Sequence, residues 1–333
     1  MCHDTRRHAD ARAPATLVAL TVVAAALLAG CDDGPTRPGA AATVSAADAS
    51  QAAWSPDGKQ IAFTSTRTGT RQIYLVDLDG THLVELTHDG ENASPAWSPD
   101  GRRLAFARRS PGEAESGGAA IFTIGADGTG LVRVAGGPAG AASPSWSPDG
   151  QRVVFSGVPA AGAPPVLLVA EVNGTGDVTA LAPDLVGATT PAWSPDGAWI
   201  AFAVVHAGEM QRAGDTQLYV MHADGSGIAA LTERTSWNND RSPAWSPDGR
   251  RIVFESDRGG GADLLWRDLY VVDRDGSHMV PLTQATLRNR LEPAWSPDGT
   301  RIAFTSFGAA AGDHTALYVM HADGTQVVAL TEQ

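Results

Sequence analysis

One five-residue motif dominates the sequence and limits what the chain can fold into. Trp-Ser-Pro-Asp-Gly recurs six times at intervals of 43 to 52 residues, with its tryptophan at Trp54, Trp97, Trp146, Trp193, Trp245 and Trp295. A long period repeated this often is typical of solenoids and propellers, in which no single repeat can bury its own apolar face. A single repeat architecture must therefore account for about 280 of the 333 residues.

Every repeat contains the same succession of short apolar runs. The motif is followed by a triplet such as Ile61-Ala62-Phe63, then by a run such as Ile73 to Val76, and finally by a run such as Leu83 to Thr87. The runs are rich in β-branched and aromatic residues and are bounded by glycine, proline and aspartate, which favours strands over helices. Together with the segment around the tryptophan, they predict four strands in each repeat.

The residues between these runs predict the turns. Ser-Pro-Asp-Gly suits a type I turn, because proline has the φ angle of the second position and glycine tolerates a positive φ at the fourth. This turn would join the first strand to the second, and Asp-Gly pairs such as Asp79-Gly80 would join the third to the fourth. Both turns would lie on one rim, and the six motif aspartates are interpreted as turn residues rather than as an acidic ring.

These repeats predict an all-β fold, a six-bladed β-propeller of four-stranded antiparallel blades over residues 51–333. One such sheet cannot bury both of its faces, but six sheets in a ring can. Each motif tryptophan would fill the space between two blades and bury about 150–250 Å². The blades are complete in sequence order, so we expect no interlocking strand, and the seam between the first and last blades should be the weakest unless residues 41–50 contribute.

The N-terminal segment reads as an export signal. Residues 1–30 contain arginines followed by an uncharged run from Ala15 to Gly30, which is short for a bilayer span. Leu28-Ala29-Gly30-Cys31 resembles the bacterial lipobox, in which the cysteine is lipidated and the chain is cut before it. We predict a lipoprotein signal peptide over 1–30, then lipidated Cys31 and a flexible tether over 31–50. An uncleaved anchor and an ordinary signal peptide are the alternatives.

Composition excludes several classes of function. The net charge of −13 argues against a nucleic-acid partner, and 43% hydrophobic with 18% charged residues excludes disorder of the whole chain. Cys2 and Cys31 are the two cysteines, so the mature domain would hold no disulfide and no cysteine-based metal site. We predict no cofactor and no metal, and we expect a monomer. Absence of the G-x-S-x-G, H-E-x-x-H and P-loop motifs disfavours an enzyme without excluding one.

The pattern A-W-S-P-D-G, I-A-F, I-Y-V, D-G and L-T resembles the WD-like propeller repeat of the TolB family. Proteins of that family carry an α/β domain before the propeller and bind a peptidoglycan-associated lipoprotein through the propeller. About twenty tether residues precede the first repeat here, so the resemblance implies a TolB-like propeller but not its partner. Similar repeats also gate prolyl-oligopeptidase-type hydrolases, whose catalytic domain has no counterpart in this sequence.

The loops of the opposite rim vary in length and sequence, and such loops usually carry binding residues. The fourth to sixth repeats have the greatest chemical variety there. We predict that partner or ligand binding involves Trp237, Asn239, Asp240, Arg241, Trp266, Arg288, Arg290 and Glu292. Exposed tryptophan and arginine are typical interface anchors. The two tryptophans could instead pack against their own loops, in which case they are structural.

The sequence leaves three functions open. The first is a non-enzymatic protein-interaction module, an exported lipoprotein anchored in the bacterial envelope by lipid on Cys31, which binds an envelope protein or a peptidoglycan-associated partner. The second is a glycan-binding or glycan-cleaving propeller, in which Trp237 stacks on a sugar and Asp240 or Glu292 transfers protons. Paired carboxylates with shifted pKa values at the channel mouth would favour it. The third is a purely structural scaffold. If the chain is a protein-interaction module, replacement of Trp237 and Arg290 by alanine should change the free energy of unfolding by about 1 kcal/mol at most.

Overall fold

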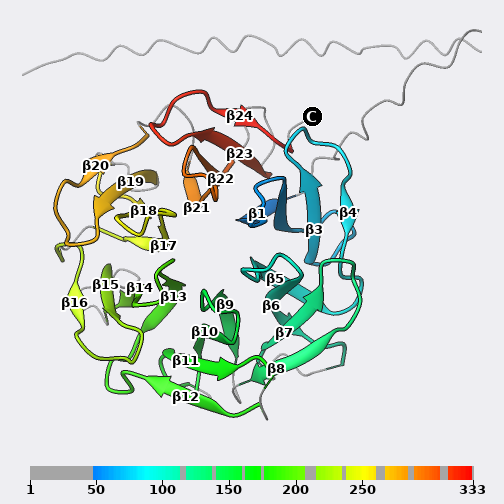
Figure 1. Cartoon of the computed structure of the whole chain (residues 1–333), viewed down its shortest axis with the longest axis horizontal. Helices are drawn as coiled ribbons and strands as arrows, with labels where there is room; N and C mark the ends of the chain where they lie inside the picture. The colour runs from blue at the N-terminus through cyan, green and yellow to red at the C-terminus, as the bar shows by residue number, and fades with distance from the viewer. Residues whose placement is uncertain are drawn as a thin grey trace, which may run out of the picture. The chain divides into compact units, whose positions relative to one another are not determined.

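The computed structural model shows six four-stranded antiparallel sheets arranged in a ring around a central channel (Figure 1). The structure describes residues 48–112, 118–136, 140–159, 162–173, 176–206, 215–234, 238–259, 267–283, 289–307 and 314–331. Within these ranges every regular element is a strand, and no apolar helix of membrane-spanning length occurs. The predicted all-β, six-bladed propeller is therefore confirmed. The predicted signal peptide, Cys31 and most of the tether lie outside the described residues.

Each blade consists of four strands that are consecutive in the chain and run from the channel outward. The strands of blades 1 to 3 are β1 (Ala49–Trp54), β2 (Gln60–Ser65), β3 (Gln72–Asp77), β4 (Val84–Glu85), β5 (Glu91–Trp97), β6 (Arg103–Arg109), β7 (Ala120–Gly125), β8 (Val132–Gly136), β9 (Ala141–Trp146), β10 (Arg152–Gly157), β11 (Val166–Glu171) and β12 (Val178–Leu181). Those of blades 4 to 6 are β13 (Ala188–Trp193), β14 (Trp199–Val205), β15 (Thr216–His222), β16 (Ala229–Ala230), β17 (Arg241–Trp245), β18 (Arg251–Ser256), β19 (Asp268–Asp273), β20 (Val280–Pro281), β21 (Arg290–Trp295), β22 (Arg301–Phe307), β23 (Thr315–His321) and β24 (Val328–Ala329).

The Ser-Pro-Asp-Gly turns form as the sequence predicts. In blade 1 the amide of Gly58 donates to the carbonyl of Ser55 at 2.8 Å and closes the turn. The Asp57 carboxylate accepts from the Ser55 hydroxyl at 2.7 Å and from the Lys59 amide at 3.1 Å. The other five copies have the same serine-to-aspartate hydrogen bond. This confirms that the motif aspartates serve the turn.

The blades are held together by apolar packing between neighbouring sheets. The phenylalanine at the centre of each second strand is fully buried, as in Phe63 and Phe155. The motif tryptophans lie between blades, and the indole of Trp146 donates to the carbonyl of Ala96 on the preceding blade at 3.0 Å. The guanidinium of Arg103, also on the preceding blade, covers the same indole at 5.2 Å from its centroid. Equivalent arginines cover the motif tryptophans of blades 1, 4 and 6.

Each inner strand contains a bulge where it faces the channel. The pairing register shifts by one residue in all six blades, so that two residues oppose the central phenylalanine of the second strand. The first of the two has a left-handed backbone, with φ between 46° and 58°, although none is glycine. These six residues, which we call the channel ring, are Gln51, Ser94, Ser143, Thr190, Ser242 and Glu292.

Among the described residues no strand interlocks blades 1 and 6, because each sheet is made from consecutive strands. Side chains and backbone close the ring instead. The Trp54 indole donates to the Ala294 carbonyl at 3.1 Å, and the Asp48 carboxylate accepts from the Thr315 amide at 2.9 Å. Strand β1 begins at Ala49, two residues before the predicted start of the propeller. The end of the segment predicted as a tether therefore contributes to the seam.

The packing of Trp146, which is only 6% exposed, generates a stability prediction. Trp146→Ala should lower the free energy of unfolding by about 3–5 kcal/mol, because it leaves a cavity between blades 2 and 3. Urea denaturation followed by circular dichroism measures this loss. Val328→Ala, at a side chain 63% exposed, is the control and should stay within about 0.5 kcal/mol. Equal small losses in both variants would contradict the assigned role of the tryptophan.

Candidate functional site

The candidate site is the polar middle of the channel. The channel ring lines a cavity of about 190 Å³. Blades 2 to 5 contribute serine or threonine to the ring, whereas blade 1 contributes Gln51 and blade 6 contributes Glu292. Glu292 is therefore the one ionisable member of the ring, and it breaks the near-sixfold symmetry of the channel.

The bulges leave backbone amides that pair across blade boundaries. The amide of Ser94 donates to the Gln51 side-chain oxygen at 2.8 Å, and the amide of Gln51 donates to Glu292 Oε2 at 2.7 Å. The amide of Glu292 in turn donates to Glu255 Oε2 at 2.9 Å. Each acceptor lies on the blade that precedes its donor, so these hydrogen bonds connect blades 5, 6, 1 and 2 and cross the closing seam.

The buried carboxyl group of Glu255 and the half-buried carboxyl group of Glu292 therefore lie next to each other in this chain of hydrogen bonds. Burial raises the pKa of Glu292 to about 7, partly offset by the Gln51 amide, and the nearby Glu255 raises it further. Burial also raises the pKa of Glu255, against the opposing effect of the Arg267 guanidinium, which lies 3.1 Å from Glu255 Oε1. Glu292 has no ion pair with any described residue.

Arg241 lies one residue before the channel ring in blade 5 and is paired in β-register with Glu255. It is half-buried, and its guanidinium donates to neutral oxygens, with Nε 3.3 Å from the Thr216 hydroxyl and Nη2 3.5 Å from Asn239 Oδ1. Desolvation and the nearby Arg267 both lower its pKa. Among the described residues no carboxylate lies within ion-pair distance of Arg241.

The structure divides the predicted binding residues into groups. Arg241 and Glu292 line or flank the channel, and Asn239 donates from its amide and side chain to Asp257, both at 2.7 Å. Asp240 is fully buried and pairs with Arg258. Trp237, Trp266 and Arg288 lie outside the described residues, so their predicted roles stay predictions.

Arg290 is 4% exposed and lies 3.1 Å from the Asp268 carboxylate. This burial argues against the expectation that removal of Trp237 and Arg290 leaves stability nearly unchanged, because breaking a buried ion pair costs about 3–5 kcal/mol. The error came from placing Arg290 in an exposed loop, whereas it begins the inner strand β21.

Glu255 is the residue that sequence reasoning missed. It directly follows the central phenylalanine of the second strand, a position that holds Thr64, Ala107, Ser156, Ala203 and Thr305 in the other blades. A glutamate at a position that is otherwise small or hydroxylated is a departure from the repeat. Alignment of the six copies would have revealed it, whereas its contact with the amide of Glu292 depends on the ring.

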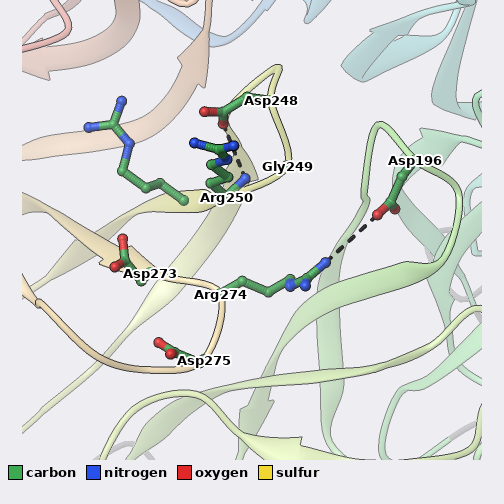
Figure 2. Close-up of a pocket in the computed structure, with 8 residues that line it drawn as sticks. Asp196, Asp248, Gly249, Arg250, Asp273, Arg274 and Asp275 are labelled. Carbon is green, nitrogen blue, oxygen red and sulfur yellow. Dashed lines mark hydrogen bonds and ion pairs between the residues drawn. The ribbon is translucent and has the colours of Figure 1, made fainter.

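A separate pocket of about 770 Å³ lies on the turn rim, between the turns of blades 4 and 5. Figure 2 shows Arg274 extending toward Asp196, with 3.7 Å between guanidinium and carboxylate, while Asp248 accepts from the backbone amide of Arg250 in its own turn. Hydroxyl groups of their own turns lower the pKa values of Asp196 and Asp248. These carboxylates already have partners, so the pocket is a weaker candidate than the channel.

The fold and the channel define a TolB-type six-bladed propeller. Residues 40–115 and 160–266 match the TolB beta propeller domain, and this match covers more than half of the chain. The chain therefore belongs to the TolB beta-propeller family.

Several solved structures are similar to this chain. A putative TolB from Agrobacterium tumefaciens is 24% identical with a TM-score of 0.61, over 82% of this chain and 90% of that one. TolB from Acinetobacter baumannii is 21% identical with a TM-score of 0.58, over 84% and 62%. An oligogalacturonate lyase from Vibrio parahaemolyticus is 16% identical with a TM-score of 0.56, over 86% and 79%. At these identities the likenesses show the fold alone.

The raised pKa of Glu292 generates a pH prediction. Its pKa is about 7 in the folded chain against an ordinary value of 4.5, so the folded state holds this proton more tightly than the unfolded state. The stabilisation is present below pH 4.5 and is lost as the pH rises through 7. Between pH 5 and pH 8 the wild type should lose about 2–3 kcal/mol relative to Glu292→Gln. Urea denaturation at both pH values measures the difference, and parallel curves for the two proteins would contradict the assignment.

Proposed function

We propose that this chain is an exported lipoprotein, anchored in the bacterial envelope, whose propeller binds a protein partner without catalysing a reaction. Its membership of the TolB beta-propeller family supports a protein-interaction role. The observation that carries the proposal is the guanidinium of Arg241, which is half-buried at the channel and has no carboxylate partner among the described residues.

Arg241 is suited to anchoring an acidic side chain of the partner. Its hydrogen bonds to Thr216 and Asn239 hold the guanidinium in place, so little side-chain entropy remains to be lost on binding. Its planar donors match a carboxylate in two parallel hydrogen bonds, which are about twice as strong as neutral ones.

The anchor of this proposal is the lipid on Cys31. The segment that follows is rich in alanine, glycine and proline, and about 18 residues of flexible chain span about 20–25 Å. A propeller on such a tether would stay near the membrane and reach a partner in the envelope, either a membrane protein or one associated with peptidoglycan. Mass spectrometry of the membrane-extracted protein tests this directly, since a diacylglyceryl-modified N-terminal cysteine is expected.

Capture from detergent-solubilised envelope of the source cell tests the binding role. Immobilised chain should retain a stoichiometric protein, and Arg241→Ala should weaken retention by about tenfold or more, as for an interface hot spot of about 2 kcal/mol. Arg102→Ala is the matched control, because Arg102 is an exposed arginine on the turn rim. Equal capture by both variants would refute the role of Arg241.

Glycan cleavage is a second candidate, favoured by the adjacent carboxyl groups of Glu255 and Glu292. A group with a pKa near 7 suits general acid or base catalysis at neutral pH. The likeness to an oligogalacturonate lyase suggests a uronate-containing substrate, whose carboxylates Arg241 would bind.

Incubation of the chain with oligogalacturonate and with peptidoglycan fragments tests this candidate. Chain shortening, followed by mass spectrometry, should occur with the wild type and fall by about 100-fold or more in Glu292→Gln. Glu91→Gln, at an exposed glutamate outside the channel ring, should retain full activity. Absence of shortened products with the wild type would eliminate cleavage and leave the protein-binding proposal standing.

A further inference from the structure

We propose that the channel ring is a binding site for a primary ammonium group carried on an apolar chain, with the carboxylate of Glu292 as its counter-ion. The site is distinct from the partner-binding surface at Arg241. Three features of the channel support it: the charge of Glu292, the hydroxyl groups that line the same cavity, and an adjoining cavity whose side chains are mostly tryptophan, proline and alanine.

Glu292 is half-buried and lacks the ion pair that its buried neighbours have. The charge of Arg71 acts to lower the pKa of Glu292, but no ion pair joins the two residues. Buried charges are normally paired. In the same part of the propeller Asp240 pairs with Arg258, Glu255 with Arg267 and Asp268 with Arg290. Glu292 has no such partner among the described residues. Its Oε2 accepts hydrogen bonds from the Gln51 amide and from the Thr305 hydroxyl, at 2.7 Å and 3.3 Å.

The second oxygen, Oε1, receives no hydrogen bond from the described residues, and Glu292 lines the cavity of the channel ring. A carboxylate in this environment is stabilised by a cation that enters the cavity. The carboxyl group stays protonated for part of the population at neutral pH when no cation is present, because its pKa is about 7.

Hydroxyl-bearing side chains line the same cavity. Ser94, Ser143, Thr190 and Ser242 line it together with Glu292. The Thr190 hydroxyl oxygen is buried and has no hydrogen-bond partner among the described residues. An ammonium group has three donors and no acceptor, so one N–H can meet the carboxylate while the others meet hydroxyl oxygens.

Other cations fit these residues less well. No group of three or more histidine, cysteine, aspartate or glutamate side chains that could hold a metal occurs in the described part of the chain, and divalent metal ions favour several charged ligands. A guanidinium is planar and pairs best with both oxygens of a carboxylate, whereas Glu292 has one oxygen already engaged. A compact, three-donor ammonium matches the single open oxygen.

A second cavity adjoins that of the channel ring. A cavity of about 320 Å³ is lined by motif tryptophans, prolines and alanines, and it shares Ala52, Pro95 and Pro144 with the cavity of the channel ring. The tryptophans directly precede the Ser-Pro-Asp-Gly turns, so this apolar section lies on the turn-rim side of the ring. An alkyl chain that passes through it would bring its terminal ammonium to Glu292.

Calorimetric titration of the purified chain with n-butylammonium chloride at pH 8 tests the proposal. We expect saturable binding at least tenfold tighter than that of n-butanol, which has the same stem without the charge. Tetramethylammonium, which has charge but no N–H donor, should bind at least tenfold more weakly. At pH 6 the affinity for n-butylammonium should fall by about tenfold, because the ligand must displace the proton of Glu292.

Variants locate the site. Glu292→Gln keeps an oxygen that can accept from the Gln51 amide, and it should weaken n-butylammonium binding at least tenfold and remove the difference between pH 6 and pH 8. Thr190→Val, which replaces the unpartnered hydroxyl by a methyl group, should weaken it about threefold. Glu91→Gln, at an exposed glutamate at the start of β5, is the control and should bind like the wild type.

The source of the ammonium group is distinguished by two further ligands. An Ala-Leu amide with a free N-terminus represents a peptide terminus, and N-acetyl-lysine amide represents a lysine side chain; acetylation of either amine should abolish binding. Failure of the wild type to bind n-butylammonium at pH 8, equal binding of n-butanol, or unchanged binding in Glu292→Gln would overturn the proposal. None of these results would affect the capture experiment, which depends on Arg241.

Discussion

The structure depends on the packing of one sheet face against the next around the ring. A four-stranded blade has two apolar faces, and each is buried only because another blade lies against it. The central phenylalanines are fully buried in every blade, and the motif tryptophans fill the space between sheets. Arginines from preceding blades cover four of the indoles, which combines apolar contact with a cation–π interaction. Hence the six blades must fold as one unit.

The same packing produces the chemistry of the channel. Where six inner strands converge, each carries a bulge with a left-handed, non-glycine residue. Such residues cost about 1–2 kcal/mol each in backbone strain, so the surrounding sheets must hold them in place. The bulges turn six side chains toward one cavity, and they free backbone amides that need acceptors. For the amides of Glu292, Gln51 and Ser94 these acceptors are the side chains of Glu255, Glu292 and Gln51, respectively.

The seam between blades 1 and 6 contains the ionisable residue of the channel ring. No strand within residues 48–331, as far as the structure describes them, interlocks blades 1 and 6. The seam between these blades instead contains hydrogen bonds between Gln51 and Glu292, between Trp54 and Ala294, and between Asp48 and Thr315. The side chain of Glu292 therefore both helps to close the ring and provides the ionisable group of the channel. A cation at Glu292 would act on the carboxylate that also accepts a hydrogen bond across the seam, so ligand binding and ring stability should be thermodynamically linked.

Sequence alone determined the strands, the turns and the number of blades, because these depend on residues within one repeat of about 50 positions. The roles of Asp57 and its five equivalents followed from turn chemistry for the same reason. Tertiary structure decided which side chains meet in the channel. Glu255 and Glu292 are 37 positions apart, and Gln51 and Glu292 are 241 apart. Arg290 was assigned to an exposed loop, because the repeat pattern shows neither that the inner strand begins at this residue nor that Asp268 of the preceding blade pairs with it. Contacts of this kind exist only after neighbouring blades have packed together, and the contact between Gln51 and Glu292 exists only after the last blade has met the first. No local pattern encodes them.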